Sequence, residues 1–182
     1  MAAPDHKHKK LESRLGYAFT EVALLEEALT HVSAGNSGIS YQRLEFLGDR
    51  VLGLVVSNML FEAFPAAPEG ELSKRLADLV SKESCAAIAR EWQLTLHLRL
   101  GEGESRSGAG KRDPLLGDAC EAVIGAVYRD GGFAAAEKLI RTHWQPRMTA
   151  TALVPKDAKT LLQELVQAEG LPVPMYRDIG RS

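Results

Sequence analysis

The sequence contains no long hydrophobic run. None of its apolar stretches reaches the roughly 20 residues that a helix needs to cross a bilayer, so we expect no membrane partner. Residues 1–10 include three lysines, but no apolar signal core follows them. We interpret this segment as a short disordered basic tail of a cytoplasmic protein.

The sequence also has few cysteines and a small net charge. The two cysteines, Cys85 and Cys120, have neither paired nor CxxC spacing, which fits reduced, buried thiols in a reducing compartment. Histidines and cysteines nowhere cluster with the spacing of a zinc site. Because the net charge is −2, composition alone does not indicate a nucleic-acid binder, and any basic surface must be local.

What the sequence does contain is a helical stretch at residues 42–56 with an unusual placement of charge. Beyond Arg50 the stretch is apolar on nearly every side, which is typical of a helix at the buried centre of a domain. Glu45 and Asp49 nevertheless stand near its start, four residues apart and therefore on one helical face. Because like charges close to a core are costly, this pair requires a positive partner.

A second helix of the buried type carries a similar pair. Residues 115–128 are almost wholly apolar, and Asp118 and Glu121 interrupt them on one shared face. Small residues within or beside the two pairs would let helix backbones approach closely: Gly48, Gly117 and Gly125. The two pairs can therefore face each other.

Four carboxylates around one point would form an all-oxygen site. Such a site suits Mg²⁺ or Mn²⁺ rather than Zn²⁺. Mg²⁺ held by carboxylates usually takes phosphate oxygens as further ligands and favours phosphoryl transfer. A single acidic pair is more often just a solvated helix face, but two pairs inside helices too apolar to be exposed favour a metal site.

The remaining segments predict an all-α domain with little or no sheet. Residues 11–19 are expected to be a short amphipathic segment. Expected helices cover residues 21–31 with Thr20 as N-cap, 42–64, 71–92, 115–128, 133–149 and 158–169. Residues 94–100 fit either a short strand or one helical turn, and residues 101–112 are expected to be a flexible loop. The cations of that loop are equally consistent with solubility and with RNA contact: Arg106, Lys111 and Arg112. Three aromatic residues are expected in the core or at an interface: Phe46, Trp92 and Trp144.

The stretch Arg43-Leu44-Glu45-Phe46-Leu47-Gly48-Asp49, followed by an apolar helix, resembles the signature of the ribonuclease III family. Residues 117–126 are similar to that family's other acidic helix. Three further segments agree with the family in order and spacing: Thr30-His31, residues 69–73 and Arg106-Ser107-Gly108. The resemblance predicts an endonuclease domain at residues 11–150, a linker at 151–156, and the start of an α+β double-stranded-RNA-binding domain at 157–182.

This resemblance implies a homodimer that cleaves double-stranded RNA with Mg²⁺ and leaves 5′-phosphate and 3′-hydroxyl ends. Its expected substrates are ribosomal-RNA precursors and some messenger RNAs. The implied metal ligands are Glu45, Asp49, Asp118 and Glu121, with Asp49 and Glu121 the most critical for catalysis. Phe46 matches an aromatic residue that inserts into the partner subunit.

The sequence departs from the family pattern at two positions near the signature. Gln42 stands where an acidic residue is common, and Arg50 replaces a small residue and could pair with Asp49 or reach RNA. Residues 157–182 match only the beginning of an RNA-binding domain, so we expect weak, strongly salt-dependent RNA binding.

Two other functions remain to be weighed against cleavage. One is a non-cleaving module that binds structured RNA or a ribosome on the same scaffold, and the other is a helical dimerisation domain without an RNA role. Inactive relatives would be expected to lose some of the acidic residues. All four are present here, which favours the enzyme.

Overall fold

The computed structural model describes residues 8–34 and 40–151, together with the single residues 166 and 170. The chain divides into two compact units, residues 1–148 and 149–182. Residues 35–39 and nearly all of the expected linker and RNA-binding fragment at 151–182 lie outside the described residues. All the named helices begin in the first unit, and the last of them ends at Thr151.

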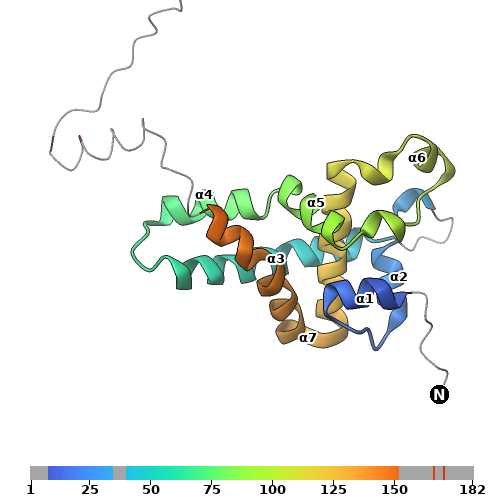
Figure 1. Ribbon diagram of the computed structural model, residues 1–182, viewed down its shortest axis with the longest axis horizontal. Helices are drawn as coiled ribbons and strands as arrows, with labels where there is room; N and C mark the ends of the chain where they lie inside the picture. Colours follow the sequence, from blue (N-terminus) through green and yellow to red (C-terminus); the bar gives the residue numbers. More distant parts are fainter. Residues whose placement is uncertain (1–7, 35–39, 152–165, 167–169, 171–182) are drawn as a thin grey trace, which may run out of the picture. The chain divides into compact units, whose positions relative to one another are not determined.

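The described residues fold into helices, which confirms the all-α fold class (Figure 1). A single bridge between Thr30 and Arg99 is the one β-type pairing in this part of the chain. In chain order the helices are α1 (Lys9–Leu15), α2 (Val22–Ala28), η2 (Val32–Ala34), α3 (Gln42–Ala63), α4 (Glu69–Leu79), α5 (Lys82–Glu91), η3 (Leu94–Leu96), α6 (Glu102–Arg106), η4 (Ala109–Lys111) and α7 (Asp113–Thr151).

The single helix expected at residues 71–92 is wrong, because two helices, α4 and α5, occupy this stretch. They are separated at Ser81, whose backbone is extended at φ −62° and ψ 155°. The Ser81 hydroxyl accepts a hydrogen bond from the backbone N–H of Ser84 at 3.2 Å. Ser81 is therefore an N-cap, and this local side-chain bond starts a new helix within a continuous apolar pattern.

The segments that follow α5 also differ from the sequence-based expectation. Residues 94–100 contain the helical turn η3, and the bridge to Thr30 involves only Arg99. Residues 101–112 include two short helices, α6 and η4, where a flexible loop was expected. Gly108 lies between them with a positive φ of 69°, a conformation that glycine adopts without strain.

Asp130 of α7 forms hydrogen bonds with the segment between α1 and α2. The helix α1 begins at Lys9, before the expected boundary at residue 11. The prediction that Thr20 caps α2 is wrong, because the N-cap position is Glu21 and no side chain makes a capping bond there. Asp130 instead binds the backbone just before the helix. Its carboxylate accepts hydrogen bonds from the backbone N–H groups of Thr20 and Glu21, both at 2.8 Å, and from the Tyr17 hydroxyl at 2.7 Å. A long-range contact thus fixes the segment that leads into α2, where no side chain caps the helix.

The two predicted helices at 115–128 and 133–149 join in α7 with an interruption at Gly132, as the Gly131-Gly132 pair indicates. Gly132 has φ 74° and ψ −174°, which is not helical. The core gathers around this helix, and both tryptophans are fully buried in it, as expected. The indole N–H of Trp144 donates to the carbonyl of Leu79 at 2.9 Å, so its polar atom is satisfied.

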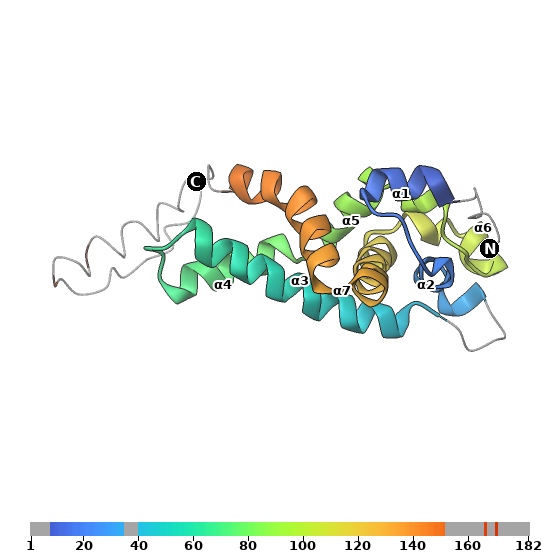
Figure 2. The ribbon, with the colours of Figure 1, turned by 90° about the horizontal axis from the view of Figure 1, so that it is seen from below.

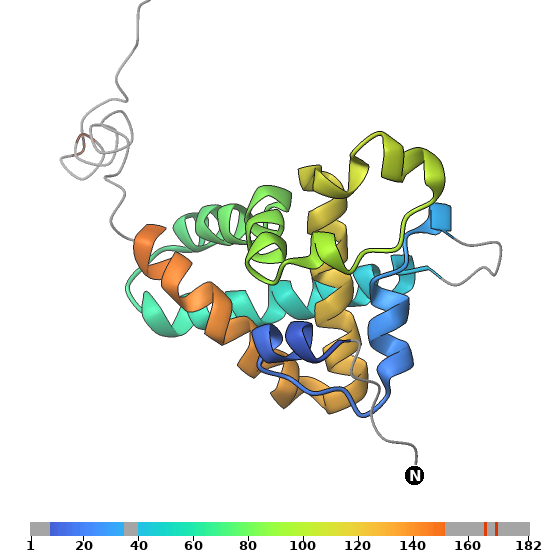
Figure 3. The same ribbon diagram turned by 45° about the vertical axis from the view of Figure 1, so that its right-hand side comes forward.

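The feature that positions the functional site is the crossing of α3 and α7, which lie against each other in Figures 2 and 3. A Cβ on Gly48 would stand 1.8 Å from the carbonyl oxygen of Glu121, and a Cβ on Gly125 would stand 2.2 Å from that of Leu44. Only glycine fits at these two places because backbone touches backbone. The expected close approach at Gly48 and Gly125 is therefore observed, and it brings the two acidic segments together.

Candidate metal centre

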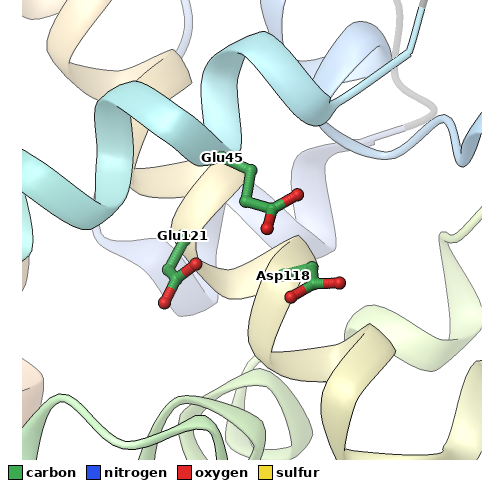
Figure 4. A group of neighbouring side chains, drawn as sticks. All are labelled: Glu45, Asp118 and Glu121. Atoms are coloured by element: carbon green, nitrogen blue, oxygen red, sulfur yellow. The ribbon is translucent and has the colours of Figure 1, made fainter.

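Three carboxylates from two helices converge at the crossing. Glu45 comes from the first turn of α3, and Asp118 and Glu121 come from α7. One oxygen of each lies within 4.8 Å of the others, and Figure 4 shows the three side chains as neighbours at the crossing. Glu121 is only 3% exposed, so this group stands partly inside the protein.

Lys82 forms ion pairs with all three carboxylates, and sequence reasoning did not single it out. The ammonium of Lys82, at the start of α5, donates to Glu121 Oε2 at 2.9 Å and to Asp118 Oδ1, and lies 3.6 Å from Glu45 Oε1. The sequence places Lys82 among ordinary polar positions. The sequence did indicate that the acidic residues need a positive partner, but it did not indicate which residue supplies it.

The crowding of these groups shifts their pKa values. Burial raises the pKa of Glu121 to about 7, with repulsion from Asp49 and Glu45 adding to the effect and the hydrogen bond from Lys82 opposing it. Burial, and then the nearby Asp118, also raise the pKa of Glu45. Burial lowers the pKa of Lys82, but hydrogen bonds to Asp118 and Glu121 outweigh this, so its pKa is raised. The site therefore holds more negative charge than its single ammonium compensates.

The fourth predicted ligand, Asp49, stands apart from this group of three. Its carboxylate pairs with the guanidinium of Arg50, one of the two alternatives that the sequence left open for that arginine. Asp49 nevertheless lines the same open cavity as Glu45, Lys82 and Glu121, a cavity with a volume of about 420 Å³. Gln42, which replaces a common acidic residue, lines this cavity too.

The basic residues expected to contact phosphate are exposed but not gathered into the carboxylate group. Arg106 lies 3.5 Å from Glu102 within α6, and both side chains are more than 80% exposed. Lys111 and Arg112 follow in and after η4 and are also exposed. The structure thus leaves these three cations accessible to solvent and to a polyanion.

The chemistry of the donor set fits a hard divalent cation. All three converging side chains are carboxylates, the ligand type that Mg²⁺ and Mn²⁺ prefer, and the buried thiols Cys85 and Cys120 are not among them. Three carboxylates against the one ammonium of Lys82 leave a formal charge of −2. A divalent ion balances this charge.

The sequence is similar to those of known proteins of one family. A family model described as "Ribonuclease-III-like" matches residues 21–148. The chain is 54% identical over 182 residues to Ribonuclease 3 of Methylocella silvestris, a match that covers all of this chain and 76% of that protein. It is 55% identical over 175 residues to Ribonuclease 3 of Rhodopseudomonas palustris, covering 94% of this chain and 64% of that protein.

Solved structures with a similar fold come from the same family. The nuclease domain of ribonuclease III from Campylobacter jejuni superimposes with a TM-score of 0.71 at 37% identity, covering 84% of this chain and 100% of that one. A second structure of that domain, which concerns flexibility in a region involved in dimer formation, gives a TM-score of 0.72 at 40% identity and covers 76% of this chain and 99% of that one. By the match of its sequence and of its helical architecture, this chain belongs to the ribonuclease III family.

Proposed function

We propose that this chain is an Mg²⁺-dependent endoribonuclease that cleaves double-stranded RNA and leaves 5′-phosphate and 3′-hydroxyl ends. The observation that carries the proposal is the group of three carboxylates at the crossing of α3 and α7. The relatives named Ribonuclease 3 supply the reaction class. Precursors of ribosomal RNA and some messenger RNAs are the substrates that we propose for it.

Glu45, Asp118 and Glu121 would hold the ion, which when bound lowers the pKa of a water molecule and stabilises the oxyanions of an in-line displacement. Glu121 is the most buried of the three, so it fixes the inner side of the site. The cavity beside it is open and leaves room for an RNA phosphate.

Asp49 is the second residue that we propose as critical for catalysis, together with Glu121. It lines the cavity one helical turn beyond Glu45, but its carboxylate is engaged by Arg50. Because the Arg50 side chain is 70% exposed, this ion pair is weak and can open. Asp49 would then turn to the site, and the Arg50 guanidinium would be free to contact the RNA backbone.

A homodimer accounts for the uneven burial of α3. The helix is apolar almost all round, yet Phe46, Leu54 and Phe61 are 68%, 60% and 71% exposed. With 100° per residue these three fall within about 80° of each other around the helix, so they form one apolar face. We propose that the partner subunit covers this face and that Phe46, which also borders the cavity, joins the interface to the site.

Location and RNA affinity are further parts of the proposal. Among the described helices none is long and apolar enough to span a bilayer. Cys85 and Cys120 are buried, free thiols, which is consistent with the reducing cytoplasm. RNA binding by this chain would depend strongly on salt, since exposed cations such as Arg106, Lys111 and Arg112 would supply the phosphate contacts.

Incubation with labelled duplex RNA tests the proposal. We expect cleavage with Mg²⁺, and none with EDTA or in the variant Glu121→Gln, which keeps the shape of the side chain but removes its charge. Glu83→Gln is the matched control, because Glu83 is an exposed glutamate on α5. Duplex binding without cleavage in Mg²⁺ would instead favour the non-cleaving RNA-binding function, and equal cleavage in all samples would place the activity elsewhere.

A further inference from the structure

Lys82 is the one basic side chain that contacts all three converging carboxylates in the described structure. Its ammonium hydrogen-bonds to Asp118 and Glu121 and lies 3.6 Å from Glu45. These acids come from two helices, and the lysine comes from a third, so the contact joins α3, α5 and α7. A bound divalent ion would need the same carboxylate oxygens.

The position of Lys82 is set by packing as well as by charge. It is the first residue of α5, directly after the Ser81 N-cap. A Cβ on Gly117 of α7 would lie 2.9 Å from Lys82 Cδ and 3.1 Å from the Lys82 carbonyl oxygen. The stem of the lysine therefore lies against the backbone of α7, and its side chain is only 42% exposed. The fold thus delivers this ammonium to the carboxylates, unlike a lysine that extends freely into water.

We propose that Lys82 is a positioning residue that holds the three carboxylates together before metal binds and then gives way to the divalent ion. The inference rests on the proposed metal site. Before metal binds, three carboxylates and one ammonium carry a formal charge of −2. A divalent ion that takes the place of the ammonium leaves a formal charge of −1, so it neutralises the carboxylates better than the lysine does. The ammonium then competes for oxygens that the metal needs, so Lys82 weakens metal affinity while it keeps the site assembled.

A purely orienting role for Lys82 predicts the opposite change in metal affinity when the lysine is removed. If Lys82 only oriented the carboxylates as an outer partner of the bound metal, its removal would weaken metal binding by about 10- to 100-fold. If it competes with the metal, its removal tightens binding, because the ion no longer has to displace an ammonium. The sign of the change in affinity therefore separates the two roles.

The experiment measures Mn²⁺ affinity of the full chain by titration calorimetry at a pH of about 8, above the pKa of Glu121. We expect Lys82→Met to bind Mn²⁺ about tenfold more tightly than the parent, since one competing cation is gone. Lys82→Arg keeps a cation and should stay near the parent. The control is Lys74→Met, which removes an exposed lysine from α4 and should leave the affinity unchanged. Unchanged or weaker binding by Lys82→Met overturns the proposal.

Thermal unfolding gives a second readout without any catalytic step. In EDTA, Lys82→Met should melt at a lower temperature than the parent, because three carboxylates then face one another without a cation. Saturating Mn²⁺ should remove the difference. A melting temperature in EDTA equal to or above that of the parent also overturns the proposal. If the parent itself binds no Mn²⁺, the metal site fails; if the parent binds and cleaves but Lys82→Met is not tighter, only the role of Lys82 fails.

Discussion

The crossing of α3 and α7 offers the sharpest test of how this fold builds its site, through the substitution Gly48→Ala. The added Cβ would stand 1.8 Å from the carbonyl oxygen of Glu121 and 2.8 Å from the amide nitrogen of Gly125. Real Cβ atoms essentially never approach closer than 3.0 Å, and ordinary contact begins at 3.4 Å. The two backbones must therefore separate by 1.2 to 1.6 Å, the difference between these values and 1.8 Å.

This separation acts on stability and on the site together. Neither contacting atom belongs to a side chain that could rotate away, so the strain costs about 3 kcal/mol or more, the upper part of the range for overpacked cores. Glu45 is carried by one of the displaced helices, and Asp118 and Glu121 by the other. Mg²⁺ demands near-ideal octahedral geometry, and a misplacement of about 1 Å can reduce a catalysed rate about 100-fold. We therefore expect cleavage to fall by at least this factor.

Gly53→Ala is the matched control, because Gly53 lies on the same helix and a Cβ there would meet nothing within 4 Å. Alanine should stabilise this helical position by about 0.5–1 kcal/mol. Both variants are measured by denaturant unfolding, Mn²⁺ affinity and duplex cleavage. If Gly48→Ala matched Gly53→Ala in all three, backbone contact at the crossing could not be what assembles the site.

Three further perturbations test named contacts. The pKa of Glu121 is raised to about 7 in the fold, so the folded protein is destabilised when this carboxyl ionises, as pH rises through 7. In EDTA at about pH 8, Glu121→Gln should therefore be more stable than the parent by at most about 3 kcal/mol. Urea titrations should show that this advantage disappears near about pH 4, where the parent carboxyl is protonated. The pKa of Asp130 is lowered, because its hydrogen bonds from Tyr17 and two backbone amides outweigh its burial. Asp130→Ala should lose about 1 kcal/mol of stability at neutral pH, and this deficit should shrink as pH falls below about 3.9. A deficit that stayed constant with pH would exclude a role for the charged carboxylate. Phe46→Ser should shift sedimentation from dimer toward monomer while the melting temperature of the subunit stays nearly unchanged, since Phe46 is 68% exposed, and an unaltered dimer would exclude the α3 face as the interface.

The sequence alone determined the helical class, the family and the approximate course of the long helices. These properties depend on local information: apolar periodicity, the break after Phe64, and the glycine pair at 131–132, where Gly132 has a positive φ. The acidic spacing also indicated correctly that Asp118 and Glu121 share a face and lie together. Gly48 and Gly125 indicated a close helix crossing, and the structure places backbone against backbone at both.

Tertiary structure alone decided which charges meet. Lys82 is 36 residues from Asp118, and no local spacing connects them; α5 brings its ammonium to the carboxylates only because Ser81 starts a new helix there. Asp130 binds the backbone just before α2 from 110 residues away, where a local rule had assigned Thr20 as the helix cap. For Arg50 the sequence had left two partners open, and the structure decided between them by pairing it with Asp49. Periodicity specifies the direction of a side chain around its own helix, whereas the partner it finds depends on how separate helices pack.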